Sequence, residues 1–296
     1  MQTAIPSRTA LRVALRRAAH QIFDSPVVFE DPLAIRILGE SYAEELRRTP
    51  TRADRPFSTG LRAFLVARSR YAEDNLTRAE STGVTQYVLL GAGLDTFAYR
   101  NPWPHLQVFE IDHPATQQWK RELLQAAGIS LPTNLTFSPV DFETQSLPEQ
   151  LFAAGFDPRR PAFFAWLGVV PYLTLQAFRS TLGFIVKHAA GSRSGEDSRG
   201  RTGITLDYGQ PRSALPLFEK LAHDSLAARV RLAGEPFRLF FTPEEIAAEF
   251  AALHNIAAVE ELEDIAGAEV NARYFHQRRD NLKIQGSSGR LLNAWL

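Results

Sequence analysis

Short runs of apolar residues alternate with amphipathic stretches through the middle of the chain. The apolar runs lie within TQYVLLG, HLQVFEI, NLTFSPV, PAFFAWLGVV and ITLDYG, between residues 85 and 209. Uninterrupted apolar runs of this length are typical of strands buried on both faces of a parallel sheet. The stretches between them have room for helices, among them one from Pro114 to Gly128 and one from Thr174 to about Ala190. The pattern therefore predicts a parallel sheet made of right-handed strand–helix–strand crossovers.

The two ends of the chain show helical patterns instead. Residues from about 9 to 80 carry helical periodicity, and TGLRAFLVARSRYAEDNL is the clearest amphipathic piece. A helical insertion is expected from Pro211 to Gly234, and TPEEIAAEF predicts a helix whose capping box joins Thr242 and Glu245. The tail after Ile256 is expected to add one antiparallel strand. We therefore predict an α/β fold with a seven-stranded, mostly parallel sheet, helices on both faces, and an N-terminal helical cover over the turn that follows the first strand.

One polar tract interrupts the alternation. The segment GSRSGEDSRGRTG, from Gly191 to Gly203, contains no apolar residue. Because such a segment has nothing to bury in a core, we expect it to form a mobile surface loop.

The composition is that of an ordinary globular protein without electrostatic bias. The 296 residues are 45% hydrophobic and 22% charged, and 33 Lys and Arg balance 33 Asp and Glu. A chain of zero net charge has no global field to gather nucleic acid or an anionic membrane, so neither is expected as a partner. The lack of cysteine excludes disulfides and thiolate metal sites. Since there is no signal-peptide pattern and no apolar run near the roughly 20 residues of a membrane span, we expect a cytoplasmic protein.

The first apolar run stops at a glycine pair. Gly91 and Gly93 follow Leu90 almost directly, and glycines at the end of a buried strand let the backbone approach a ligand closely. A dinucleotide-binding turn would carry a third glycine where Thr96 stands. The turn therefore favours a cofactor other than a dinucleotide, although a plain tight connection between strand and helix has the same pattern.

Acidic residues follow at the ends of the next two strands. The second run ends in Glu110 and Asp112, about 20 residues after the glycines, where a carboxylate can accept hydrogen bonds from both hydroxyls of a ribose. The third run is followed by Asp141 and Phe142, within reach of an adenine ring that lies over the sheet edge. A nucleoside without a pyrophosphate fits these positions better than NAD does.

A family resemblance rests on six segments in their order along the chain. These are VARSRYAEDNL, VLLGAGLDTFAYR, FEIDHPATQQWK, PVDFETQ, WLGVVPYLT and GEPFRLFFTPEE. Together they resemble the leucine carboxyl methyltransferase-like family, in its bacterial branch of S-adenosylmethionine-dependent methyltransferases, from near Thr9 to around Phe275. The resemblance implies a Rossmann-like class I methyltransferase fold and S-adenosylmethionine as the cofactor. The single domain over residues 1–296 would then consist of a helical cover, a cofactor-binding core, a helical insertion and the C-terminal part of the core, with bounds 1–80, 81–210, 211–241 and 242–296.

The resemblance also implies roles for single residues. Arg68 in VARSR would bind the methionine carboxylate of the cofactor, and a guanidinium can hold a carboxylate through paired donors. The alternative is an ordinary helix-surface arginine paired with Glu73 or Asp74, which follow closely on the same predicted helix.

Five further residues would surround the rest of the cofactor. Gly91 and Gly93 would let its methionine portion lie against the backbone, Asp112 would hold the ribose hydroxyls, and Asp141 with Phe142 would recognise adenine. Two of these residues have plainer alternatives. Asp112 precedes a proline-initiated helix and could act as its cap or as a partner of its dipole, and Asp141 could be a turn residue.

One position departs from the family pattern. Members of the family usually carry a glutamate after the aromatic residue of the fourth strand, facing the cofactor's ammonium group, where this chain has Leu167 in the word WLGV. Loss of such a charge-assisted contact costs on the order of 1.5 to 3 kcal/mol, or roughly ten- to a hundredfold in affinity, unless backbone carbonyls substitute. The departure leaves open a non-catalytic, repurposed nucleoside-binding protein of the same fold. An NAD-dependent oxidoreductase is the other alternative, which Thr96 and the Asp141-Phe142 pair disfavour.

The methyl acceptor is the least constrained part of the prediction. Methyl transfer from a sulfonium depends mainly on alignment, so a carboxylate acceptor needs no general base, whereas a hydroxyl acceptor would want one. Five histidines form no recognisable catalytic or metal-binding pattern: His113, His188, His223, His254 and His276. Tyr172 and Tyr208 follow the fourth and fifth strands, where acceptor-site residues fall in this architecture, although either tyrosine could serve packing alone.

The N-terminal helices and the insertion offer an apolar wall for the acceptor. The candidate wall residues are Phe57, Phe64, Leu217, Phe218, Phe237, Phe240 and Phe241. Nearby positive charge could come from Arg68, Arg70 and Arg100. We therefore expect a small, partly apolar acceptor that is methylated at an oxygen atom, with a protein C-terminal carboxylate as the second choice; the oligomeric state is left open.

Overall fold

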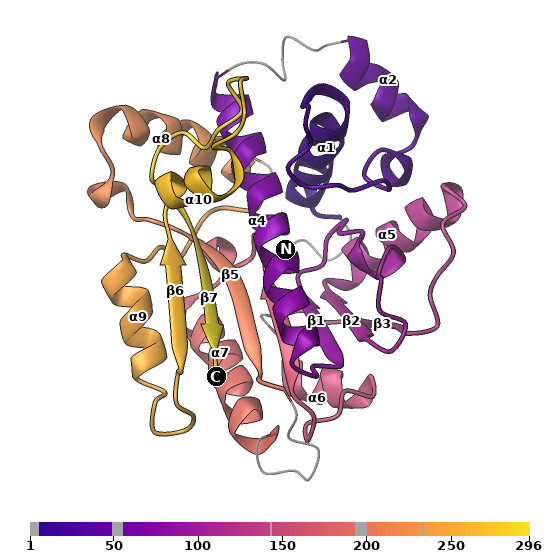
Figure 1. Cartoon of the computed structure of the whole chain (residues 1–296), viewed down its shortest axis with the longest axis vertical. Coiled ribbons are helices and arrows are strands. Elements are labelled where there is room, and N and C mark those ends of the chain that lie inside the picture. Colours follow the sequence, from indigo (N-terminus) through magenta and orange to yellow (C-terminus); the bar gives the residue numbers. More distant parts are fainter. Residues whose placement is uncertain (1–5, 49–55, 143, 193–199, 233) are drawn as a thin grey trace.

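A single seven-stranded sheet forms the centre of the molecule (Figure 1). The computed structural model describes residues 6–48, 56–142, 144–192, 200–232 and 234–296. The strands are β1 (Gln86–Leu90), β2 (Gln107–Asp112), β3 (Leu135–Pro139), β4 (Ala162–Trp166), β5 (Gly203–Gly209), β6 (Glu261–Ile265) and β7 (Gly289–Trp295). The five apolar runs of the sequence form the first five strands, which confirms the predicted α/β fold.

The strand order places a crevice at the centre of the sheet. The order is β3-β2-β1-β4-β5-β7-β6, so the chain moves outward from β1 to β3 and then returns to the other side of β1 with β4. Tyr87 of β1 lies opposite Val108 of β2 and Phe163 of β4, and both pairings are parallel. Only β7 runs against its neighbours β5 and β6, which confirms the single antiparallel strand expected from the tail. In open α/β sheets, ligands bind where the strand order reverses, at the carboxyl ends of the strands.

Helices cover both faces of the sheet. One face carries α4 (Pro56–Ser81), α5 (Pro114–Ala126) and α10 (Gly267–Tyr274), and the other carries α6 (Leu147–Ala153), α7 (Leu175–Ser192) and α9 (Pro243–Ala251). Figure 1 shows α4 crossing in front of the sheet and α7 behind it. The alternation along β1 explains the two cores, because Val88 and Leu90 belong to the cluster with α7 whereas Tyr87 and Leu89 face α4.

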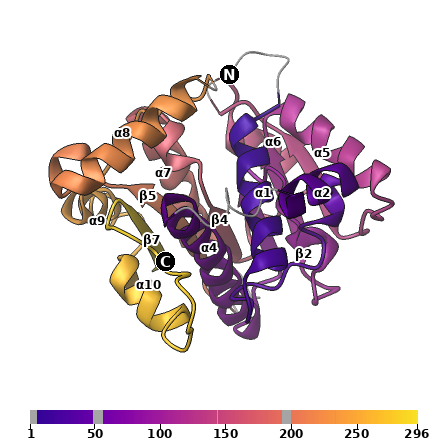
Figure 2. The ribbon, with the colours of Figure 1, turned by 90° about the horizontal axis from the view of Figure 1, so that it is seen from above.

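The N-terminal helices lie above the carboxyl ends of the parallel strands. They are α1 (Arg8–Phe23), the short η1 (Arg36–Leu38) and α2 (Glu40–Arg48). A Cβ built on Gly93 would lie 3.3 Å from the Cβ of Ala10, so α1 packs directly on the glycine turn. From above, α1 and the insertion helix α8 (Leu217–Leu232) lie on either side of α4 (Figure 2). The predicted helical cover is therefore present.

A buried polar network fixes α1 to the turn. The guanidinium of Arg17 pairs with Asp31 and with Asp95, 3.1 Å away at Oδ2. Thr96 is fully buried, donates to Asp31 Oδ1 at 2.7 Å, and accepts from Arg17 Nη2 at 2.9 Å. Burial alone would raise the pKa of Asp95, but Arg17 and Arg100 outweigh it and the pKa is lowered. Thr96, which occupies the position of the third glycine in a dinucleotide-binding turn, thus connects the turn to Arg17 of α1 and to Asp31.

Two local predictions have different outcomes. The capping box of α9 is confirmed, because Thr242 Oγ1 accepts from Glu245 N at 3.2 Å and Thr242 N donates to the Glu245 carboxylate at 2.8 Å. The loop expected over residues 191–203 is wrong at both ends, since α7 continues through Ser192 and β5 begins at Gly203. The remainder of that prediction, residues 193–199, lies outside the described residues.

None of the helices in the described part of the chain combines the length and the apolar character needed to cross a membrane.

Candidate functional site

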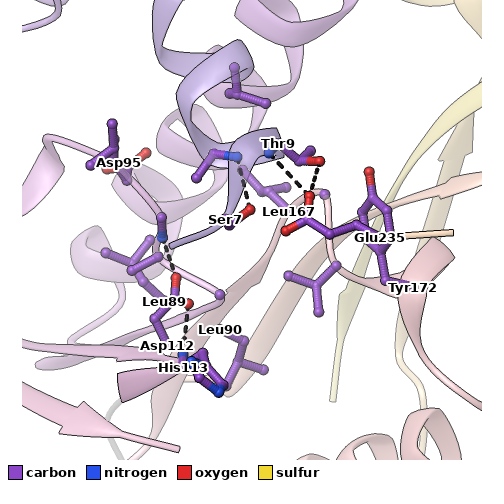
Figure 3. A pocket seen from close by; sticks show the side chains of 18 of the residues that line it. Ser7, Thr9, Leu89, Leu90, Asp95, Asp112, His113, Leu167, Tyr172 and Glu235 are labelled. Atoms are coloured by element: carbon purple, nitrogen blue, oxygen red, sulfur yellow. Dashed lines mark hydrogen bonds between the residues drawn. The ribbon is translucent and has the colours of Figure 1, made fainter. Parts of the chain in front are cut away.

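A pocket of about 230 Å³ opens at the carboxyl ends of β1 to β4, beneath α1. We call it the strand-end pocket. All six residues predicted to bind the cofactor line it: Arg68, Gly91, Gly93, Asp112, Asp141 and Phe142. The fold therefore brings together, from four separate segments, the residues on which the sequence prediction rested. Figure 3 shows the pocket, with Asp112 labelled at the end of β2. The role of these six residues in binding a cofactor stays a prediction.

The glycine turn is shaped by packing within the protein. Gly91 and Gly93 have φ angles of +72° and +49°, which favour glycine. A Cβ on Gly91 would come within 2.2 Å of Val169 Cγ2, so no other residue fits without movement. The amides of Gly91 and Ala92 both donate to the carbonyl of Ile111, at 2.8 and 3.0 Å. The turn is thereby fixed against both neighbouring strands, and its backbone forms the floor of the pocket.

Asp112 lies at the end of β2 with its carboxylate held in place. Oδ2 accepts from Gly93 N at 2.5 Å and Oδ1 accepts from His113 N at 2.7 Å. Burial raises the pKa of Asp112, and the two backbone donors oppose that effect. Each carboxylate oxygen has a second lone pair, so the group can still accept from two ligand hydroxyls. His113 is the N-cap of α5 and accepts from Ala115 N, so the alternative in which Asp112 caps this helix is wrong.

Arg68 projects from α4 and is buried. Its Nη1 donates to Asp207 Oδ2 at 3.0 Å, and the other oxygen of Asp207 accepts from the amide of Gly168. The nearby Glu73 and Asp74 pair with other arginines, so the alternative based on sequence neighbours is wrong. The Nε of Arg68 is buried without a hydrogen-bond partner. Arg68 lines the strand-end pocket, and its Nη2, unlike Nη1, has no hydrogen-bond partner among the described residues.

Asp141 and Phe142 lie just beyond β3. The amide of Asp141 donates to Gln145 Oε1 at 2.8 Å, and its carbonyl accepts from Gln145 N at 2.9 Å. Asp141 is therefore part of a turn, which agrees with the plainer alternative without excluding a second role for its side chain. Phe142 is half-buried against the core cluster that includes α7.

Leu167 and an unpredicted glutamate occupy the same pocket. Leu167 is half-buried and lines the strand-end pocket. Glu235, from the segment after α8, lines it as well, and its carboxylate accepts from Thr9 N at 3.1 Å and from Thr9 Oγ1. In Figure 3, Thr9 and Glu235 meet near the end of α1, and Leu167 lies close to them. Glu235 belongs to the segment GEPFRLFFTPEE, but its contact with α1 could not be predicted, because no local pattern indicates a pairing with so distant a segment.

A second and larger pocket of about 700 Å³ adjoins the first. We call it the aromatic pocket. The two pockets share five lining residues: Thr9, Val13, Arg68, Gly168 and Tyr172. Tyr172 is largely enclosed, and burial raises its pKa to about 12. Its hydroxyl is therefore protonated at neutral pH and can donate a hydrogen bond at the junction of the two pockets.

The aromatic pocket contains part of the predicted apolar wall. Four of the candidates line it: Phe64, Phe218, Phe237 and Phe240. The other three differ: Leu217 is 72% exposed and outside the lining, Phe241 is 4% exposed within the core, and the side chain of Phe57 lies outside the described residues. Arg70 and Arg100 line neither pocket, because they pair with Asp74 and Glu73 instead. The expectation of positive charge from these two arginines is wrong.

Among the other tyrosine and histidine candidates, some line a pocket and others do not. Tyr208 lines the aromatic pocket, but its hydroxyl donates to Asp264 at 2.7 Å. His223 lines the same pocket and packs on Phe240, with ring centroids 5.3 Å apart. His188 of α7 is buried against Phe156 and Phe164 and belongs to neither lining.

Comparison with known proteins gives consistent matches. The family model for leucine carboxyl methyltransferase matches residues 10–186. The "Putative S-adenosyl-L-methionine-dependent methyltransferase YktD" of Bacillus subtilis is 30% identical, and the alignment covers 93% of each chain. Rv1896c of Mycobacterium tuberculosis, which carries the same description, is 34% identical over 68% of this chain and 66% of its own.

Solved structures agree on the fold. A DUF574 family protein of Streptomyces avermitilis superposes with a TM-score of 0.52 at 14% identity, and covers 96% of both chains. A protein of Thermobifida fusca described as a putative methyltransferase gives a TM-score of 0.51 at 17% identity, over 96% of this chain and 93% of its own. At these identities the structural likeness shows the fold alone.

Proposed function

The chain belongs to the leucine carboxyl methyltransferase family and is therefore an S-adenosylmethionine-dependent methyltransferase, and we propose that it methylates an oxygen atom of a small acceptor molecule. The observation that carries the proposal is the pair of adjoining pockets, which share Thr9, Val13, Arg68, Gly168 and Tyr172. Methyl transfer needs donor and acceptor in contact and in line. Two pockets with a common wall provide separate sites for two molecules that meet at one place.

The residues of the strand-end pocket fit S-adenosylmethionine chemically. Arg68 pairs with Asp207 through Nη1 alone, so Nη2 of its guanidinium can donate to the methionine carboxylate. Asp112 is held by two backbone amides in a position to accept from ribose hydroxyls, and Asp141 with Phe142 lies where adenine would bind. The cofactor supplies an activated methyl group, and these side chains bind and orient it.

Glu235 is our candidate for the partner of the cofactor's ammonium group. The family position for this contact is occupied by Leu167, which has no charge to offer. Glu235 lines the same pocket, and two hydrogen bonds from Thr9 hold its carboxylate. A carboxylate supplied from the insertion would replace the missing one, and cofactor binding would then depend on the contact between Glu235 and Thr9 of α1.

A carboxylate is the favoured acceptor group. In the transfer, a carboxylate oxygen forms a bond to the methyl carbon as the carbon–sulfur bond breaks, so the acceptor loses its negative charge and the sulfonium becomes a neutral thioether. No proton has to leave. Of the five residues shared by the two pockets, none offers a general base, because Tyr172 remains protonated at neutral pH and a guanidinium has no acceptor atom. A hydroxyl acceptor would require a base at this junction.

The test is incubation of the protein with methyl-labelled S-adenosylmethionine and a cell extract, followed by separation by size and class. Label in a low-mass, base-labile fraction supports a small-molecule ester, and base-stable low-mass label would indicate a hydroxyl acceptor. Label confined to protein would replace the small molecule with a C-terminal carboxylate. Label in nucleic acid, or no label despite cofactor binding, would contradict the proposal. Asp112→Ala is the matched control and should transfer no label.

A further inference from the structure

Three arginines gather on one side of the aromatic pocket. Arg12 and Arg16 come from α1, one helical turn apart, and Arg229 comes from α8. Arg16 Nη1 donates to the carbonyl of Arg12 at 3.0 Å, and Arg12 Nη1 donates to the carbonyl of Arg229 at 3.4 Å. The three residues therefore form one cluster where the cover and the insertion meet, and we call it the arginine cluster.

Two charges of this cluster, those of Arg12 and Arg16, have no carboxylate partner among the described residues. Within the same part of the chain, Arg16 Nε is buried without a hydrogen-bond partner. Burial and the nearby Arg229 and Arg12 lower the pKa of Arg16 to about 10. The next residue of the same helix, Arg17, instead pairs with two carboxylates, those of Asp31 and Asp95. Holding the like charges of Arg12 and Arg16 one helical turn apart without a carboxylate partner is costly, and a bound anion reduces that cost.

The acidic residues of the pocket have other partners. Asp207 pairs with Arg68 at 3.0 Å. Glu219 accepts from Ser287 N at 2.7 Å and from Ser287 Oγ at 3.0 Å. The pocket therefore combines an apolar wall with one strongly cationic side.

The arginine cluster lies outside the wall that the two pockets share, where methyl transfer would take place. Arg12 and Arg16 line only the aromatic pocket, whereas Thr9 and Val13 of the same helix line both pockets. An anion bound by Arg12 and Arg16 is thus not the oxygen that meets the cofactor at the shared wall.

We propose that Arg12, Arg16 and Arg229 form a binding site for an acid group of the acceptor that is distinct from the methylated one. The acceptor would be an amphipathic molecule with two acid groups: an apolar body lies among Phe64, Phe237 and the other rings, one acid group binds the cluster, and the other is esterified. The inference rests on the proposed function only for the identity of the acid group that is methylated. The anion site itself is a property of the pocket and can be tested without any methyl transfer.

The test uses two fluorescent probes with the same aromatic body. The compound 8-anilinonaphthalene-1-sulfonate carries an anionic group, and N-phenyl-1-naphthylamine does not. We expect saturable binding of the anionic probe to the native chain. Replacing Arg16 by Gln, or Arg229 by Gln on the exposed surface of the other helix, should raise its Kd roughly ten- to a hundredfold while leaving the Kd of the neutral probe unchanged. Arg8→Gln, at an exposed position of α1 outside both pockets, is the matched control and should change neither value.

Three outcomes would overturn the inference. These are no saturable binding of the anionic probe, the same affinity in native, Arg16→Gln and Arg229→Gln proteins, or equal losses for both probes. Calorimetric titration with S-adenosylhomocysteine is run on the same samples. Because that titration reports only on the strand-end pocket, a failure of the proposed function is seen there and a failure of the anion site is seen with the probes.

Discussion

At the scale of single residues, charged and polar side chains that are far apart in the sequence pair with one another at the strand-end pocket. Arg68 meets Asp207, and Glu235 meets Thr9, 226 residues away. These contacts fix the charges that a zwitterionic, sulfonium-bearing cofactor would encounter. The sequence located Arg68 and Asp112 because motif positions are local, but it could not show their partners, because no local periodicity reports a pairing between distant segments.

The proposed role of Glu235 leads to a rescue experiment. Glu235→Gln should weaken S-adenosylmethionine binding roughly ten- to a hundredfold, since a charge-assisted contact is lost while the hydrogen bonds from Thr9 can persist. Leu167→Glu in the Glu235→Gln background should restore most of that affinity, limited by the cost of placing a carboxylate in a half-buried site. Calorimetric titration measures both variants. An unchanged affinity in Glu235→Gln would show that the ammonium group is bound elsewhere.

The burial of His188 leads us to expect that the stability of the protein depends on pH. It is 5% exposed against Phe156 and Phe164, and burial lowers its pKa to about 4. Between pH 6.5 and pH 4 the unfolded chain then binds a proton that the folded chain does not, so the free energy of unfolding falls as the pH falls through this window. The loss attributable to His188 should be about 2 to 3 kcal/mol at pH 4.5 relative to pH 7.

Urea unfolding of the native protein and of His188→Phe at the two pH values measures this contribution. The variant should lose correspondingly less stability on acidification. His254→Gln, at an exposed position, is the control and should behave like the native chain. Equal acid sensitivity in His188→Phe and the native protein would mean that His188 does not titrate as its burial implies.

At the scale of elements, the apolar runs determined the strands, and the helical periodicity determined the cover. Runs such as Tyr87–Leu90 are apolar because both faces of the sheet are covered, and this is a local signal. The end of α7 was misjudged for the opposite reason. Gly191 and Ser192 are poor helix formers by type, yet they lie within the helix, and Ser192 is buried with its hydroxyl on the carbonyl of Ala189. Tertiary burial there outweighs local propensity.

The attachment of α1 to the glycine turn can be tested through Thr96. Thr96→Val removes a buried hydroxyl that bonds Asp31, Arg17 and Arg100, so unsatisfied buried partners should lower the free energy of unfolding by about 1 to 3 kcal/mol. Amide exchange in α1 should accelerate more than exchange in α7, because α1 contributes Arg17 to this network and α7 contributes no residue to these bonds. Thr77→Val, at an exposed position of α4, is the control. Equal exchange rates in α1 of the native and Thr96→Val proteins would contradict the proposed attachment.

At the scale of the whole molecule, the N-terminal helices and the insertion after β5 close over opposite sides of one sheet edge. The strand-end pocket takes its floor from the sheet, whereas the aromatic pocket takes most of its wall from α1, α4 and α8. The sequence predicted the floor of the strand-end pocket well, because the apolar runs reveal the strands whose ends form that floor. It predicted the second pocket only in part: four of seven wall candidates line it, and the arginine cluster was missed because its members come from two helices whose packing the pattern does not specify.

The central claim is that the strand-end pocket binds S-adenosylmethionine through Asp112, and calorimetric titration with S-adenosylhomocysteine tests it most directly. We predict one equivalent bound per native chain, no heat with NADH, and a loss of at least about a hundredfold in affinity for Asp112→Ala, because two hydrogen bonds to a charged group disappear. Glu149→Ala, an exposed acid on α6, should bind like the native chain. The account would be contradicted if NADH bound in preference to S-adenosylhomocysteine, or if a folded Asp112→Ala protein bound S-adenosylhomocysteine as tightly as the native one.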